Sequence, residues 1–378
     1  MSTACTWRDA ASVLAVRLDG MGDLLMTTPA LRALKEALPS RRLALLTSPQ
    51  GAAIGRELPF VDDVIVFDAP WVKSGDTQPS PSATAALVRR LHARAYDAAV
   101  VFTVYSQSAL PAAMLLYQAG VPLRAAHCRE NPYALLTHWQ ADPDRDPHAG
   151  VRHEVERQID LVTSLGVDVV HTRLQFPVRA DAQRSVRAKA LAAGASTLRP
   201  WLVVHPGATA ASRRYPVASL VLAVATLAES ERWQIVIAGA GADVAAATKL
   251  AARTPGAVSL AGSLSIAELA ALLQAAEAVV CNNSVAAHLC AAVGTPVVDL
   301  YALTNPQHTP WQVAHRTLSH DVSCRYCLKS TCPLGHHRCL AGVAPEAVVE
   351  AVNSLTSTHA DRRLTPRRGG DRVVHAAT

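Results

Sequence analysis

The sequence predicts an α/β protein of two similar lobes, each built on a doubly wound parallel sheet, with a ligand cleft between them. Two observations lead to this prediction. The 378 residues are too many for one ordinary domain and enough for two that each bury a core. Short β-rich runs also alternate with longer helical patterns, and this alternation starts afresh in the second half, as in repeated βαβ units.

The first lobe is predicted to span residues 1–194. Its helical patterns are expected at 24–38 and 83–95. Strands are expected at residues 12–18, 42–48, 61–68 and 97–103.

The second lobe is predicted to span residues 195–355, with helices starting near residues 216, 243 and 284. Its strands are expected at residues 201–205, 234–238, 278–281 and 297–301. Two facing sheets of this kind bind a ligand between the carboxyl ends of both sets of strands. This is the GT-B arrangement of two Rossmann-like lobes.

Composition narrows the class of protein. Half of the residues are hydrophobic and 17% are charged, which is typical of a globular α/β chain. Aromatic residues make up only 4%, which argues against stacking platforms for single-stranded nucleic acid, so no nucleic acid partner is expected. Residues 356–378 carry five arginines against two aspartates, half of the net charge of +6. We expect this basic tail to be disordered, either in contact with anionic headgroups at the inner membrane surface or merely solvated.

The apolar runs are short. None reaches the ~20 residues of a membrane span, and residues 13–16 do not form a signal-peptide core. The sequence therefore predicts a cytoplasmic protein, whose eight cysteines stay reduced or bind metal.

A glycine-rich loop follows the first predicted strand. Gly20 and Gly22 permit a tight turn that would form an acceptor wall of the cleft, and Asp23 starts the next helix. A dinucleotide fingerprint requires a third glycine or alanine where this chain has Leu25, so hydride transfer is disfavoured. Asp23 could act as a general base on a hydroxyl or simply cap the helix.

The first strand of the second lobe ends in His205 and Gly207, and Arg213 and Arg214 follow before a helix. Paired arginines at a strand's carboxyl end suit a diphosphate leaving group, although a solvated basic turn is the alternative.

A polar turn after another apolar strand opens an alanine-rich helix. Ser284 is a natural N-cap after Asn283, and the free amides behind it can bind phosphate oxygens. His288 is either a ligand contact or a packed core histidine.

Four cysteines lie within sixteen positions near the end of the second lobe. Such spacing can close a tetrahedral zinc or iron site, and the alternative is four reduced buried thiols. A closed site of this kind would be structural. The cysteines are Cys324, Cys327, Cys332 and Cys339.

The acidic stretch 142–146 is predicted to be a solvated turn because no strand leads into it.

In order and spacing, these elements resemble glycosyltransferase family 9, the ADP-heptose:lipopolysaccharide heptosyltransferases, and most of all its heptosyltransferase II branch. The resemblance runs from about residue 12 to 355. Its specific parts are residues 16–18, 21–34, 205–208, 286–292 and 294–298.

The resemblance implies inverting transfer of a heptose from a nucleotide-diphosphate donor to an acceptor hydroxyl, such as that of a lipopolysaccharide core, another glycan or a glycolipid. No cofactor is implied for catalysis. Asp23 matches the catalytic aspartate, Arg213 the lysine that steadies the diphosphate, and Asp243 lies near the acidic residue that contacts the ribose.

Two departures from the family pattern lie in the turn before the alanine-rich helix. The family's acidic residue is Asn283 here, and its glycine is Val285, which would crowd the sugar phosphate. In a related protein-glycosylating branch, four cysteines hold iron. Two other interpretations stay open: a nucleotide-sugar epimerase or hydrolase of the same fold, and a non-catalytic sugar-nucleotide-binding protein.

Overall fold

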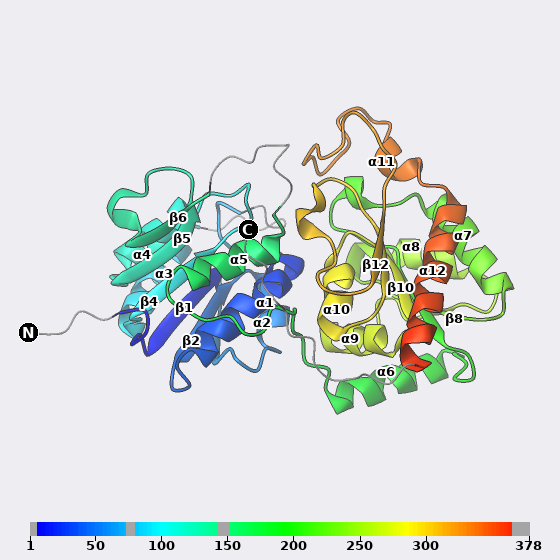
Figure 1. Ribbon diagram of the computed structural model, residues 1–378, viewed down its shortest axis with the longest axis horizontal. Coiled ribbons are helices and arrows are strands. Elements are labelled where there is room, and N and C mark those ends of the chain that lie inside the picture. The colour runs from blue at the N-terminus through cyan, green and yellow to red at the C-terminus, as the bar shows by residue number, and fades with distance from the viewer. Residues whose placement is uncertain (1–5, 73–79, 143–151, 365–378) are drawn as a thin grey trace, which may run out of the picture.

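The computed structural model describes residues 6–72, 80–142 and 152–364, which form two α/β lobes side by side (Figure 1). The first lobe contains a six-stranded parallel sheet in the order β3-β2-β1-β4-β5-β6. The strands are β1 (Ser12–Arg17), β2 (Arg42–Thr47), β3 (Asp63–Val66), β4 (Ala98–Phe102), β5 (Leu123–Cys128) and β6 (His138–Ala141).

Helices cover both faces of this sheet because β1 is apolar on both sides. Val13 and Ala15 belong to the core on the side of α1 and α5, whereas Leu14 and Val16 belong to the core on the side of α3 and α4. Such continuous burial is expected for a central parallel strand. The helices are α1 (Met21–Glu36), α2 (Pro49–Gly55), α3 (Pro81–Arg94), α4 (Leu110–Gln118) and α5 (Glu154–Thr163), with a 3-10 turn η1 (Tyr133–Leu135).

The second lobe repeats this topology. Its parallel sheet has the order β9-β8-β7-β10-β11-β12, which matches the first sheet strand for strand. The strands are β7 (Trp201–His205), β8 (Gln234–Ile237), β9 (Val258–Ser259), β10 (Ala278–Asn282), β11 (Val297–Leu300) and β12 (His315–Leu318).

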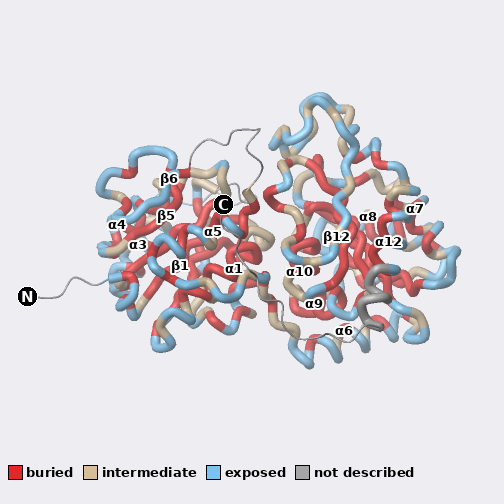
Figure 2. The backbone as a smooth tube through the Cα atoms, viewed as in Figure 1, coloured by how far each residue is buried: buried red, intermediate tan, exposed pale blue. Residues whose placement is uncertain are grey.

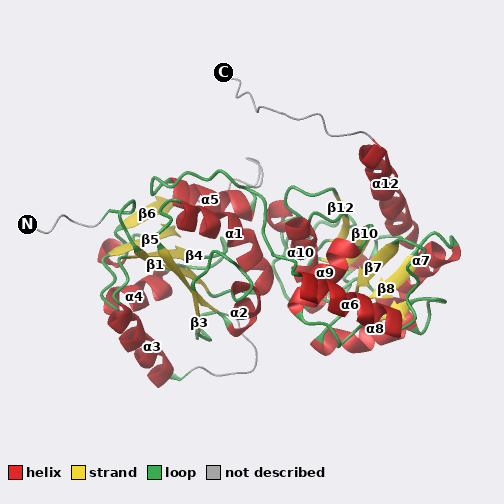
Figure 3. Ribbon diagram, turned by 90° about the horizontal axis from the view of Figure 1, so that it is seen from below, coloured by secondary structure: helices red, strands yellow, loops and turns green. Residues whose placement is uncertain are grey.

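Apart from the short α11 (Arg338–Ala341), the helices of the second half lie on the two faces of the second sheet (Figures 1 and 3). The α-helices are α6 (Ala180–Ala192), α7 (Val217–Glu229), α8 (Val244–Ala251), α9 (Ile266–Ala275), α10 (Val285–Val293), α11 (Arg338–Ala341) and α12 (Pro345–Leu364). The 3-10 turns are η2 (Ala211–Arg213), η3 (Gly241–Asp243) and η4 (Pro306–His308). Figure 2 shows that buried residues concentrate in the two sheets and that exposed residues mark the outer loops.

The predicted pair of doubly wound sheets is thus confirmed, with eight predicted strands within three residues of their observed ends. Four further strands, β5, β6, β9 and β12, were not predicted. β6 is exposed at all four positions and β9 has only two residues, so neither has the apolar run that marks a buried strand.

Two boundaries differ from those expected. Helix α6 precedes residue 194 but packs against α9 of the second lobe, where Ser185 and Lys189 contact Glu268. The chain therefore crosses between the lobes before residue 180. The disordered tail was predicted to start at residue 356, and this start was wrong, because α12 continues from Pro345 through Leu364. Residues 365–378 lie outside the described residues.

The lobes touch along α1 and α10 and through the loop after η4. The His153 side chain, at the N-cap of α5, contacts the carbonyl of Thr309 at 2.9 Å and the ring of Trp311 at 4.5 Å between centroids. Trp311 donates its indole N–H to the carbonyl of Thr172 (2.8 Å). These contacts bring the carboxyl ends of both sheets to the interlobe face.

In the described part of the chain, no helix combines the length and apolar character needed to cross a membrane.

Candidate functional site

The loop between β1 and α1 places Asp23 at the interlobe face. Gly20 is the N-cap of α1, and Asp23 is the third helical residue rather than the cap. Its Oδ2 accepts the Gly20 N–H (3.2 Å), while its Oδ1 lies 3.5 Å from Arg17 Nη2. The side chain is 27% exposed. One carboxylate can thus close the helix end and still face solvent.

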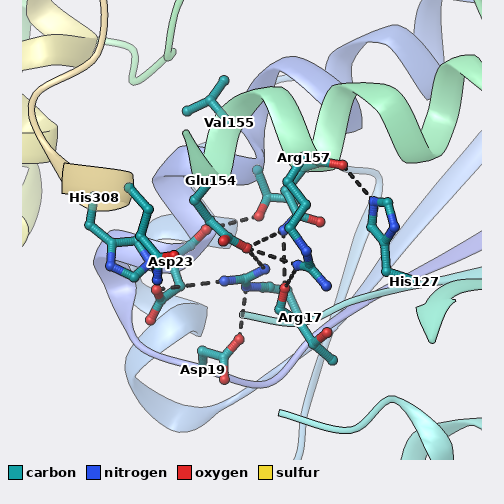
Figure 4. A network of polar contacts seen from close by, with 12 residues as sticks. Arg17, Asp19, Asp23, His127, Glu154, Val155, Arg157 and His308 are labelled. Atoms are coloured by element: carbon teal, nitrogen blue, oxygen red, sulfur yellow. Dashed lines mark hydrogen bonds and ion pairs between the residues drawn. The ribbon is translucent and has the colours of Figure 1, made fainter. Parts of the chain in front are cut away.

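Arg17, which the sequence analysis did not single out, lies behind this loop with no exposed side-chain surface. Its guanidinium meets three carboxylates, as Figure 4 shows: Asp19 at 2.9 Å, Asp23 at 3.5 Å and Glu154 at 3.9 Å. Burial raises the pKa of Asp19 to about 6; Arg17 opposes this rise and the charge of Asp23 adds to it. Burial also raises the pKa of Glu154.

A second buried arginine supports this cluster. Arg157 donates to Asp142 (2.7 and 3.0 Å) and to Glu154 Oε1 (3.0 Å), and its carbonyl contacts the ring of His127. The solvated turn predicted at 142–146 is therefore wrong for Asp142, which is buried because Arg157 neutralises its charge. Residues 143–146 lie outside the described residues. Burial lowers the pKa of His127 to about 4, so this ring is neutral.

A cavity of about 230 Å³ opens beside the loop, at the carboxyl ends of β1 and β4. Leu18 and Phe102 form apolar walls, and Thr103 and Gln107 supply polar groups. Gln107 also interacts with Asp19, which links the cavity to the buried charges. None of the described residues that line it is charged.

At Gly22 the loop packs closely against His288 of the second lobe. A Cβ atom added to Gly22 would lie 2.7 Å from Cδ2 of His288, closer than real Cβ atoms approach. Gly22 has no positive φ, so it provides space for a neighbouring lobe rather than a left-handed turn. At Gly20 an added Cβ would meet its nearest described neighbour at an ordinary 3.5 Å.

Two buried histidines of the second lobe face Asp23. Burial lowers the pKa of His288 to about 4 and that of His308 to about 3, and the charge of Asp23 opposes both shifts. Both rings are neutral at physiological pH. His288 is therefore a packed residue and at the same time a wall of the site. His308 was not predicted, since a lone histidine in a loop carries no sequence signal.

The predicted donor elements of the second lobe come together at the end of β7. Gly207 lies so close to Asp243 that an added Cβ would fall 2.0 Å from its Oδ2. The same carboxylate is 3.7 Å from Arg214 Nη2. Burial lowers the pKa of His205, and the charge of Asp243 opposes this shift. His205, Gly207, Arg214 and Asp243 thus form one polar cluster around the Asp243 carboxylate.

The two neighbouring arginines diverge. Whereas Arg214 turns to Asp243, Arg213 is close enough to His288, His308 and Asp299 to affect their ionisation. Its Nε is buried without a hydrogen-bond partner among the described residues. Arg213 therefore brings a positive charge to the region that Asp23 faces, as a diphosphate requires.

Asn283 and Ser284 lie at the start of α10, as predicted. The Asn283 amide donates to the carbonyl of Ala302 (3.3 Å), a bond that a carboxylate could not donate. Ser284 occupies the N-cap position but makes no capping hydrogen bond, and its buried Oγ has no partner within the described chain. That hydroxyl is available to a ligand at the helix N-terminus.

Asp299 on β11 is a further buried carboxyl that the sequence did not reveal. Neither oxygen has a hydrogen-bond partner among residues that the structure describes. Burial raises its pKa to about 8, and Arg213 opposes the rise.

The four cysteines lie near one another, but the described residues show no arrangement of metal ligands at them. Cys324 Sγ lies 3.7 Å from the ring of His336, and Cys332 accepts the His337 N–H (3.4 Å). Cys339 neighbours the other thiols, whose charges add to the rise that burial causes in its pKa. Within the described residues, however, no three His, Cys, Asp or Glu side chains converge as metal ligands. Sequence spacing alone could not show where the sulfurs point.

Known proteins resemble the chain over both lobes. Lipopolysaccharide heptosyltransferase 2 of Salmonella typhimurium is 25% identical over 91% of this chain and 98% of its own length. A lipooligosaccharide heptosyltransferase 2 of Campylobacter jejuni is 38% identical, but the match covers 21% of this chain and a quarter of that protein.

Solved structures show the same fold. A glycosyltransferase family 9 protein from Veillonella parvula superposes with a TM-score of 0.78 at 18% identity, over 95% of this chain and all of the other. The Escherichia coli ADP-heptose lps heptosyltransferase II gives 0.71 at 22% identity, over 92% and 99%. The model of glycosyltransferase family 9 (heptosyltransferase) matches residues 84–338. The chain is therefore a glycosyltransferase that belongs to family 9, the heptosyltransferase family.

Proposed function

We propose that the protein transfers a heptose from ADP-heptose to a hydroxyl of a lipopolysaccharide core or a related glycan, with inversion at the anomeric carbon. The sugar and acceptor class come from the names of the relatives. One observation in this chain carries the proposal: the partly exposed carboxylate of Asp23 and the charge of Arg213 both act on His288 and His308 at the interlobe contact, and the Nε of Arg213 has no hydrogen-bond partner among the described residues.

The reaction is a single displacement in which Asp23 takes the proton of the acceptor hydroxyl. The acceptor oxygen forms a bond to the anomeric carbon, and the bond from that carbon to the diphosphate oxygen breaks. ADP leaves with the bonding electrons. Arg213 and the free amides at the start of α10 stabilise the charge that develops on the diphosphate, so no cofactor takes part in this scheme.

The nucleotide is assigned to the second lobe, where Asp243 would accept from the ribose hydroxyls. Arg214 holds Asp243 and the missing side chain of Gly207 gives it room. His205, Asn283, Ser284 and His288 form the rest of the donor wall. The acceptor is assigned to the first lobe, between Gly20, Gly22 and the cavity that ends at Gln107.

We further propose a cytoplasmic location, with contact at the inner membrane face where the acceptor is a glycolipid. A structural zinc or iron at the cysteines is a further proposal, supported by the closeness of Cys324, Cys327 and Cys332 to Cys339. Metal analysis of protein purified without added metal tests it. No catalytic step depends on that ion.

The central experiment is incubation with a panel of nucleotide sugars, in which nucleotide release is followed with and without candidate acceptors. We expect ADP release that depends on both ADP-heptose and an acceptor, and a β or α product opposite to the donor anomer. Free or epimerised sugar without acceptor would favour a hydrolase or epimerase. Binding without turnover would favour a non-catalytic sugar-nucleotide-binding protein.

A further inference from the structure

The three carboxylates around Arg17 have a role that the transfer scheme leaves unexplained. A carboxylate beside a single arginine is a weak base, because the positive charge lowers its pKa by about 1–3. Asp23 lies 3.5 Å from Arg17, so the guanidinium that holds the carboxylate in place also competes with the acceptor proton for its negative charge.

Asp19 makes the closer contact with the same guanidinium. Arg17 Nε lies 2.9 Å from Asp19 Oδ2, and both side chains are almost completely buried, where charges interact strongly. Glu154 is more distant at 3.9 Å and is already engaged by Arg157. The charge of Arg17 is therefore shared mainly between Asp19 and Asp23.

We propose that Asp19 is a positioning residue that takes up the charge of Arg17, so that the guanidinium fixes Asp23 in place without depriving it of its capacity to accept a proton. This inference rests on the proposed role of Asp23 as the base. It assigns to Asp19 a task distinct from binding either substrate.

All the charged and titratable groups around the cluster enter this balance. Asp19 is faced by the charged groups of Arg17, Asp23 and Glu154, and by the neutral amide of Gln107, which hydrogen-bonds it. Glu154 is faced by Arg157 and Gln158 as well. From the second lobe, Asp23 is faced by the rings of His288 and His308, with Arg213 nearby. Because burial keeps both rings neutral, they add no charge between about pH 5 and 8.

The proposal predicts a step in the pH dependence of turnover. Asp19 has a pKa raised to about 6, so it is charged above that pH and neutral below it. Once Asp19 is neutral, the charge of Arg17 acts on Asp23 with less competition and opposes the transfer of the acceptor proton. Turnover should therefore fall as the pH drops through about 6, whereas an ordinary aspartate would titrate near 3.9.

The test is the pH profile of kcat, from pH 5 to 8.5, for the wild type and Asp19→Asn at saturating donor and acceptor. The variant has a permanently neutral side chain, so we expect about a tenfold lower kcat at pH 8 and no step near pH 6. Its KM for the donor should stay within twofold. Asp63→Asn, which removes a carboxylate paired with Arg94 in the same lobe, is the control and should keep the wild-type profile.

A second variant covers the case in which Asp19→Asn does not fold. The Gln107 side chain lowers the pKa of Asp19, so Gln107→Leu should move the step to higher pH. A step near pH 6 that persists in Asp19→Asn, or that does not move in Gln107→Leu, would overturn the proposal. A wild type that transfers no sugar at any pH would instead overturn the proposed function.

Discussion

The two lobes share one strand order, yet the loops after their first strands carry opposite charges. After β1 the chain places Asp19 and Asp23 against Arg17. β7 ends at His205, and after it the chain places Arg213, whose Nε meets no hydrogen-bond partner in the described chain. Identical topology therefore carries carboxylates on one side and an arginine on the other, which the proposed reaction would use as proton acceptor and anion site. The difference lies in a few side chains at equivalent strand ends.

The largest expected effect on the difference between the two lobes comes from removing the carboxylate of Asp23, which follows β1. Asp23→Asn should lower kcat by about 10³-fold, because the amide cannot take the acceptor proton, while ADP binding measured by calorimetry stays within a few-fold. The Gly20 N–H still finds an oxygen acceptor in asparagine, so the helix end should survive. Turnover near the wild-type level would show that another group is the base.

The matching change in the second lobe is Arg213→Ala. We expect a loss of about 10²-fold in kcat, since the developing charge on the diphosphate loses its cation, together with weaker ADP binding. Arg213→Lys should recover part of the loss, as lysine keeps the charge without the planar geometry. If Arg213→Ala changed neither kcat nor ADP affinity, the diphosphate would have to bind elsewhere.

The contact between the lobes is tested by glycine substitutions. Gly22→Ala forces a methyl group against His288, so we expect a cost of about 1–3 kcal/mol in unfolding free energy or a comparable loss in kcat/KM. Gly20→Ala is its control, because the added methyl group meets ordinary contacts and no positive φ is involved. Equal effects of both substitutions in urea unfolding and kinetics would refute the close packing.

The smallest expected effect is a change in unfolding free energy when Asp299, a buried acid of the second lobe, is replaced. Its folded pKa is raised to about 8, so between pH 4 and 8 the folded state keeps a proton that the unfolded chain releases. Stability must therefore fall as pH rises through this window. Asp299→Asn should remove the penalty and stabilise the protein by about 1–2 kcal/mol at pH 8, with little effect at pH 4.

Urea unfolding of the two proteins at both pH values measures this difference. A gain of the same size at pH 4 and pH 8 would mean that Asp299 is not protonated in the folded state. Asp181→Asn, a change at an exposed helix start, serves as the matched surface control.

The fold was predictable because its central strands are buried on both faces. Residues 201–205, for example, form an unbroken buried run, and the strand has those bounds. At the sheet edges there is no such apolar run, because β6 is wholly and β12 partly exposed. Both strands are held in the sheet by backbone pairing with a neighbouring strand. Local sequence does not record which neighbour a strand pairs with.

The positions of Asp23 and Arg213 were predictable, because each lies in the segment that follows the first strand of its lobe. Glu154 and His308 could not be predicted, because they reach Asp23 through packing between segments far apart in the chain. The four cysteines are a different case. Their spacing predicted that they lie near one another, and Cys324, Cys327 and Cys332 are close enough to Cys339 to affect its pKa, but a metal at this place stays a prediction.

The attachment of α6 to the second lobe determines how the protein could be divided. Ser185 and Lys189 bind Glu268, so α6 would move with α9 in any relative motion of the two sheets. Bending must then be absorbed by the stretch between α5 and α6, residues 164–179. A protease cut or an engineered split placed there would leave each lobe with its own helices. A cut at residue 194 would strip the second lobe of the helix that covers α9.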